Sequence, residues 1–148
     1  MAAHQMIDLL RFTEQFHKDL ADYYERLGHE MRREDVRQAL DYMAHHERCL
    51  QLCFHDYEVA APKPVTQAWL KNPPDFQYPD GLREKRVNPE MSVEEVLGLA
   101  IRFDEALIAF YQRLAEQALP GDLRAAIDAI LEMEREEEKR LVRGLQDL

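Results

Sequence analysis

Side chains that can bind a metal ion interrupt the apolar faces of four expected helices. Five of them fall near the middle of these helices: His17, Glu47, Asp104, Glu134 and Glu137. An unpaired buried carboxylate is costly in free energy, so several in one layer of a core need cations, protons or water to neutralise them. A bound metal ion would supply the positive charge. The five side chains are therefore our candidate metal ligands.

A second stripe of potential ligands follows one helix face at four-residue spacing. It consists of His45, Cys49 and Cys53. Imidazole and thiolate bind zinc, but one helix alone cannot complete such a site. Cysteine often packs as a small buried hydrophobe, and we favour that interpretation of the stripe. Two cysteines four apart on one helix do not suit a structural disulfide in a reducing compartment, so we expect free thiols.

Two helices are expected in the first part of the chain, at about residues 3–59. Apolar residues recur at helical spacing from Met6 to Leu27. A second run begins near Glu34 and ends before Pro62, because proline disfavours helix at the residue that precedes it. The short connection between the two runs predicts a helical hairpin.

Two more helices are expected at about residues 92–147. Ser92 followed by Glu95 is typical of a capping box at the start of a helix. The pair Pro120 and Gly121 ends this third helix, and Asp122 is expected to cap a fourth. The sequence thus predicts a second hairpin.

The segment at about residues 60–91 has no helical periodicity and holds six of the seven prolines. We expect a long crossover loop that packs on the helices, because it carries Trp69, Phe76 and Tyr78. A loop that crosses the bundle from end to end would make the second and third helices run parallel.

The two hairpins are related by an internal repeat. A shift of 87 positions superimposes them without a gap and pairs Phe16 with Phe103, Tyr24 with Tyr111, and Glu47-Arg48 with Glu134-Arg135. Two related hairpins joined by a crossover are a standard way to build a four-helix bundle. We therefore expect a single all-α domain over residues 1–148, with Glu47 and Glu134 approaching each other near its centre.

These residues resemble the ferritin-like superfamily, especially its rubrerythrin-type members, over both hairpins. The family pattern places a Glu seven residues before a Tyr on the first helix of each hairpin, and Glu-x-x-His on the second helix. Those residues hold two irons. By this pattern Tyr24 points back to His17. Tyr111 points back to Asp104 in the same way. The six positions are His17, Asp104, Glu47, Leu50, Glu134 and Glu137.

The chain departs from the family pattern at four of these positions. His17 replaces a bridging Glu, Asp104 is a shorter carboxylate, Leu50 cannot bind metal, and Glu137 stands where the family has His. The other positions and three of these four still offer a ligand, and imidazole and carboxylate both suit iron, manganese or zinc. The resemblance thus implies a ferritin-like four-helix bundle with a degenerate di-iron ligand set.

Three classes of function remain open at this point. The first is a bundle that binds a divalent metal, which we favour, and the second is a metal-free structural or self-association module. In that alternative, His17 and Asp104 turn to solvent, and Glu47 is held by Arg48, Arg135 or a tyrosine hydroxyl. The third class is a rubrerythrin-like oxidoreductase that acts on oxygen or peroxide.

The charge of the chain limits its partners. A formal net charge of -10 disfavours nucleic acid and anionic membranes, which attract clustered Lys and Arg. The sequence has no apolar stretch long enough to span a membrane and begins without a signal-like segment, so we expect a cytoplasmic protein. Bundles of this size often pair, so we expect a homodimer.

Overall fold

The computed structural model describes residues 5–79, 82 and 87–148, so residues 3 and 4 of the expected first hairpin lie outside the described part. Within that part the chain forms four long helices and one short helix. These are α1 (Met6–Glu30), α2 (Glu34–Ala60), α3 (Lys63–Thr66), α4 (Val93–Ala115) and α5 (Gly121–Gln146). None of the described helices is both long enough and apolar enough to cross a lipid bilayer.

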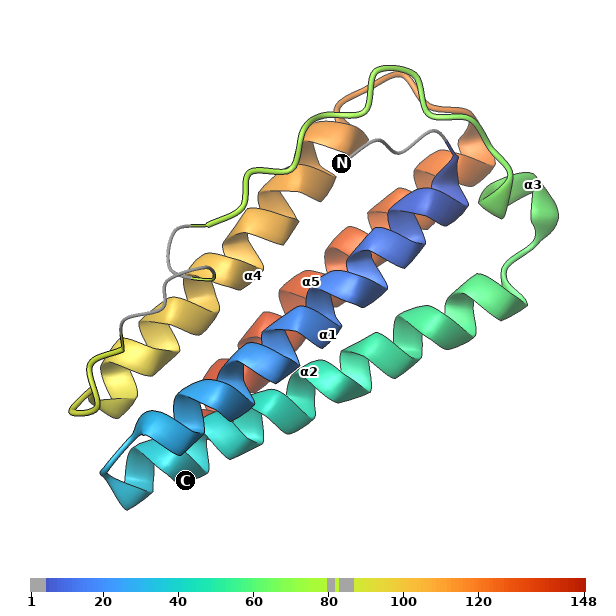
Figure 1. Cartoon of the computed structure of the whole chain (residues 1–148). Coiled ribbons are helices and arrows are strands. Elements are labelled where there is room, and N and C mark those ends of the chain that lie inside the picture. Colours follow the sequence, from blue (N-terminus) through green and yellow to red (C-terminus); the bar gives the residue numbers. More distant parts are fainter. Residues whose placement is uncertain (1–4, 80–81, 83–86) are drawn as a thin grey trace.

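The long helices form a bundle of two hairpins, α1 with α2 and α4 with α5 (Figure 1). The described parts of the segment between α2 and α4 lie along the bundle, and α4 begins at the end where α2 begins, so that α2 and α4 run in the same direction (Figure 1). The predicted crossover and the parallel second and third helices are confirmed. This arrangement brings the middle of all four long helices together.

The starts of the two helices in the second hairpin differ in their capping. The capping box of α4 is confirmed, because the Glu95 backbone N–H donates to Ser92 Oγ at 3.1 Å and the Ser92 N–H donates to Glu95 Oε1 at 3.3 Å. Asp122 was expected to cap α5, and this is wrong. The helix begins at Gly121 after Pro120, and Asp122 lies in the first turn. There its carboxylate still interacts favourably with the helix dipole.

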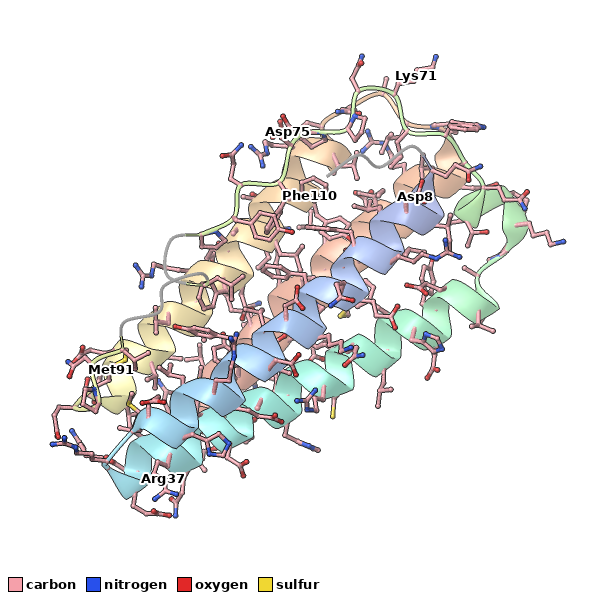
Figure 2. The ribbon with its side chains drawn as sticks, viewed as in Figure 1. Asp8, Arg37, Lys71, Asp75, Met91 and Phe110 are labelled. Carbon is pink, nitrogen blue, oxygen red and sulfur yellow. The ribbon has the colours of Figure 1, made fainter. Side chains whose placement is uncertain are left out.

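The crossover loop packs on the bundle through part of its aromatic set. Phe76 is buried, and its ring centroid lies 5.1 Å from those of both Phe12 and Phe16. Tyr78 packs edge to face on Phe76 at 4.9 Å. Trp69, in contrast, is 69% exposed. Figure 2 shows the side chains of the bundle with the loop lying along α4.

Candidate metal centre

His17 lies at the centre of the bundle, between two glutamates from other helices. Its Nδ1 is 2.5 Å from Glu47 Oε2, and its Nε2 is 2.8 Å from Glu134 Oε1. The three side chains come from α1, α2 and α5, and all three residues are buried. Glu47 and Glu134 therefore approach the same buried point from opposite sides of one imidazole ring.

The two hydrogen bonds define the charge of this ring. A carboxylate accepts hydrogen bonds, so both ring nitrogens donate only when His17 is an imidazolium. Burial lowers the pKa of His17, but the negative charges of Glu134 and Glu47 together outweigh burial and raise it well above the ordinary value. In the arrangement seen here, His17 supplies the positive charge between the two glutamates.

Asp104 brings a fourth titratable side chain to this layer, from α4. It is 6% exposed. Burial raises the pKa of Asp104 well above its usual range, and the charges of Glu47 and Glu134 raise it further. A carboxyl group in this position is favoured in its neutral, protonated form. Each long helix therefore contributes one of the four side chains of the layer.

Two polar atoms beside this layer are buried without a hydrogen-bond partner in the described part of the chain. They are Glu47 Oε1 and the Tyr24 hydroxyl oxygen. The other repeat tyrosine, Tyr111, shares a hydrogen bond of 2.5 Å with Thr13 Oγ1. A buried oxygen without a partner is costly in free energy. Glu47 Oε1 and the Tyr24 hydroxyl are therefore available for a further hydrogen bond or a ligand at the centre.

Glu137 and Leu50, which match each other in the repeat, lie differently from the four central residues. Glu137 is partly exposed, and its Oε1 accepts a hydrogen bond of 3.0 Å from Arg140. Its Oε2 is 3.9 Å from Nε2 of His46. Leu50 is buried as an apolar side chain. The structure thus brings four of the five predicted ligands together and places Glu137 in a surface ion pair.

The alternative in which His17 and Asp104 turn to solvent is wrong, because both are buried. Glu47 is not held by Arg48 either. The Arg48 guanidinium instead donates to Asp22 at 3.1 Å and to Glu25 at 2.6 Å. Sequence spacing placed His17, Asp104 and Glu47 near the core face. It did not predict which oppositely charged side chain each of them would contact.

The second stripe lies on the outside of α2. Cys49 and Cys53 are free, and both are exposed, so the prediction that they pack as buried hydrophobes is wrong. Cys49 Sγ lies 3.7 Å from Nε2 of His45. The apolar periodicity of α2 puts His45, Cys49 and Cys53 at the edge of the apolar face. In the structure they lie on the side that faces solvent.

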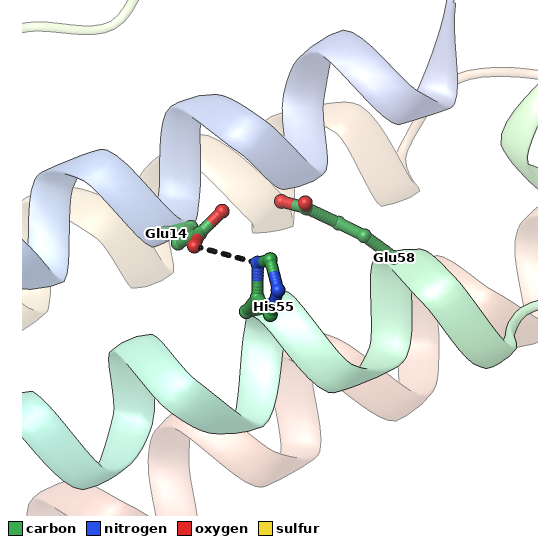
Figure 3. A group of neighbouring side chains, drawn as sticks. All are labelled: Glu14, His55 and Glu58. Atoms are coloured by element: carbon green, nitrogen blue, oxygen red, sulfur yellow. Dashed lines mark hydrogen bonds and ion pairs between the residues drawn. The ribbon is translucent and has the colours of Figure 1, made fainter.

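A different group of donors was missed by the sequence analysis. Glu14, His55 and Glu58 bring one donor atom each within 4.8 Å of the others (Figure 3). Among the described residues this is the one group of three or more such side chains that converges so closely. The signal available in the sequence was His55-x-x-Glu58, which places two donors on one helix face.

Comparison with known proteins gives one informative likeness. No protein-family model matches the chain, and no curated protein matches it. A crystal structure from Thermotoga maritima, of a protein described as ferritin-like and diiron-carboxylate, superimposes with a TM-score of 0.63. The match covers 99% of this chain and 98% of that one, at 18% sequence identity. The fold is ferritin-like.

The residues of this centre do not fit the two metal ions of a diiron-carboxylate protein. The His17 ring fills the space between Glu47 and Glu134, Leu50 offers no donor, and Glu137 pairs with Arg140. The donor types suit one ion, but the donor atoms of this layer do not converge within 4.8 Å of one another in the described part of the chain, because the His17 ring lies between the two glutamates. One ion would be held here only after that ring turned away from one of them. Three carboxyl groups and one imidazole share the layer, and Glu47 Oε1 has no partner in the described part of the chain.

Proposed function

We propose that this protein is a ferritin-like bundle that binds a single divalent metal ion through His17, Glu47, Asp104 and Glu134. The observation that carries the proposal is the burial of these four potential ligands in one layer, one from each long helix. The diiron-carboxylate description of the structurally similar protein supports metal binding by a bundle of this fold.

The charges of the layer favour a doubly charged ion. With all four groups ionised, three carboxylates would face one imidazolium in a dry environment, which is unfavourable. A proton on Asp104 reduces this imbalance in the arrangement seen here, and His17 carries the other added proton. A divalent ion could replace these two protons and leave a neutral imidazole nitrogen free to bind it, because metal ligands must be deprotonated.

The donor set also limits which ion is bound. One imidazole with carboxylates suits iron, manganese or zinc, whereas calcium and magnesium prefer oxygen ligands alone. A bound iron or manganese ion would supply one-electron redox chemistry, and zinc would supply Lewis acidity only. This chain's own residues would hold the ion, keep it buried and give up the protons that it replaces. Glu137 would join them only after leaving Arg140.

A second candidate function is favoured by one observation, the two hydrogen bonds of His17. In this reading the imidazolium permanently replaces the metal, and the protein is a metal-free structural module. The two candidates differ in what His17 does. As a metal ligand, His17 increases the metal content of the chain. As a substitute for metal, it makes metal binding unnecessary.

The test compares metal content in matched variants. The parent chain, Glu134→Gln and Glu132→Gln are exposed equally to ferrous iron under argon, desalted and measured by elemental analysis. Glu132 is exposed on the same helix, so its variant carries the same charge change away from the centre. We expect Glu134→Gln to hold one ion per chain less than the parent. Glu132→Gln should hold as much metal as the parent. Equal content in all three would overturn the proposed function.

A further inference from the structure

Glu14, His55 and Glu58 form a compact group of donors between α1 and α2, separate from the bundle centre (Figure 3). Glu14 extends from α1, and the other two extend from α2. His55 Nδ1 is 3.1 Å from Glu14 Oε1. The Glu58 carboxyl points toward the same spot from one turn further along α2 (Figure 3).

The position of the group follows from helix geometry. His55 and Glu58 are three residues apart, so their side chains project from one face of α2 in neighbouring turns. Glu14 faces them from the antiparallel α1, and its side chain is 22% exposed, against 57% for His55. The group therefore lies at the edge of the hairpin, with its carboxyl groups sheltered and its imidazole open to water.

Two carboxyl groups share this spot with too little positive charge. Glu58 Oε1 is enclosed and has no hydrogen-bond partner in the described part of the chain. Burial, and then the hydrogen bond and charge of Glu14, raise the pKa of Glu58 to about 7. The nearby His55 and Arg11 lower it only in part. A cation between the carboxylates would relieve this repulsion and occupy the free oxygen.

We propose that Glu14, His55 and Glu58 bind a zinc ion, with water completing its coordination. One imidazole nitrogen and two carboxylate oxygens are donors that zinc accepts, and three protein ligands with a water molecule is the usual number in its open sites. Zinc also binds such sites more tightly than manganese or ferrous iron does. The exposed side of His55 leaves room for the water ligand.

The 87-residue repeat distinguishes this site from the central one, because the second hairpin has no counterpart of it. Its three positions correspond, at the 87-residue shift, to Ile101, Val142 and Leu145, none of which can bind metal. The site is therefore a feature of the first hairpin alone. It shares no residue with the proposed central ligands, so either site can exist without the other.

The test is titration of the untagged, chelator-treated chain with zinc sulfate in an isothermal calorimeter. Because the exposed Cys49 and Cys53 could bind zinc themselves, all proteins carry Cys49→Ser and Cys53→Ser. In this background we compare the parent with His55→Ala and Glu58→Gln. Removal of a group that only hydrogen-bonds to a metal ligand already costs about tenfold or more in metal affinity, so removal of a direct ligand should weaken zinc binding at least about tenfold.

Two controls make the result specific. His29→Ala removes an exposed histidine near the end of α1 and should bind zinc like the parent. Glu134→Gln alters only the central layer and should keep the outer zinc site, so failure of the central proposal can be recognised separately. The proposal is overturned if the parent shows no zinc binding, or if His55→Ala and Glu58→Gln bind zinc as tightly as His29→Ala does.

Discussion

His17 is the residue on which the centre depends. Its ring contacts Glu47 and Glu134 through separate nitrogens, so its removal leaves two buried carboxylates without their shared cation. The fold can accept this only by protonating the glutamates or by admitting water or an ion. The contribution of His17 can therefore be measured in the chain from which metal has been removed.

We expect His17→Ala to lower the free energy of unfolding of the chelator-treated chain by about 3 to 5 kcal/mol, the usual cost of breaking a buried ion pair from one side. Urea unfolding followed by circular dichroism measures this difference. His29→Ala, at an exposed position, serves as the control and should change stability by about 0.5 kcal/mol at most. Similar stability of the two variants would contradict a charged role for His17.

The same residue predicts how stability depends on pH. The pKa of His17 is raised in the folded chain, so its stabilising contribution is complete below the unfolded pKa of about 6.5 and is lost as pH rises through the folded pKa. Asp104, whose pKa is also raised, acts in the same direction, because its neutral form is favoured by folding. The metal-free chain should become less stable as the pH becomes alkaline.

This pH effect is measured by urea unfolding at a series of pH values from neutral upward. The loss should be smaller in Asp104→Asn than in the parent, since one of the two groups is then absent. A parent chain that becomes more stable with rising pH would contradict the charge assignment of the centre.

The types of the central residues could be read from the sequence, but their contacts could not. Helical spacing puts His17 and Asp104 next to core phenylalanines, and this was enough to predict one polar layer. It did not predict that the imidazole would lie between the two glutamates, because that depends on side-chain rotamers and on competing partners. Glu137 shows the same limit, since Arg140 three residues away lies on the same helix face and pairs with it.

The two hairpins are built from long helices of similar length, 25 and 27 residues in the first and 23 and 26 in the second, but they differ in the ligands that they offer. The repeat aligns Leu50 with Glu137, so α2 lacks a donor one turn after Glu47. Leu50 is buried, and it lies on the same face of α2 as Glu47, three residues further along the chain. A single substitution here should therefore change how much metal the centre holds.

We expect Leu50→His to raise the metal content per chain, because it restores one Glu-x-x-His pair at the centre. Elemental analysis after exposure to ferrous iron under argon measures the change. Leu52→His adds a histidine to the exposed side of the same helix and is the matched control. If Leu50→His holds no more metal than Leu52→His, the centre does not extend toward residue 50.

Two helix glycines test how closely the helices pack. Gly98 in α4 has open space where a Cβ would be, so Gly98→Ala should raise the free energy of unfolding by about 1 kcal/mol through helix propensity. Gly144 in α5 approaches Tyr42 so closely that a Cβ would collide with the ring. Gly144→Ala should therefore gain nothing or lose stability in the same urea assay. A similar gain from both substitutions would contradict the close approach of α5 to Tyr42.

The helices themselves were largely predictable, because their apolar spacing and their stop signals are local properties of the chain. Ser92 and Glu95 fix the start of α4, and the prolines after Ala60 fix the end of α2. The zinc group at Glu14, His55 and Glu58 was not predicted, since it depends on how far α1 and α2 turn their edges toward each other.

At the scale of the whole molecule, the crossover loop determines the architecture. It returns the chain to the end of the bundle where α2 begins, so that the mid-points of four long helices meet in one layer (Figure 1). Phe76 anchors the loop against aromatic rings of α1 and α4. The parallel course of α2 and α4 followed from the length of this loop, whereas the pairing of two copies of the chain stays a prediction.

Anomalous diffraction can show whether the layer around His17 holds one ion. Crystals of the parent chain grown anaerobically with ferrous iron would be measured above and below the iron absorption edge. We expect one iron peak within bonding distance of His17, Glu47, Asp104 and Glu134. Two peaks in this layer, or none while His17 still bridges Glu47 and Glu134, would contradict it.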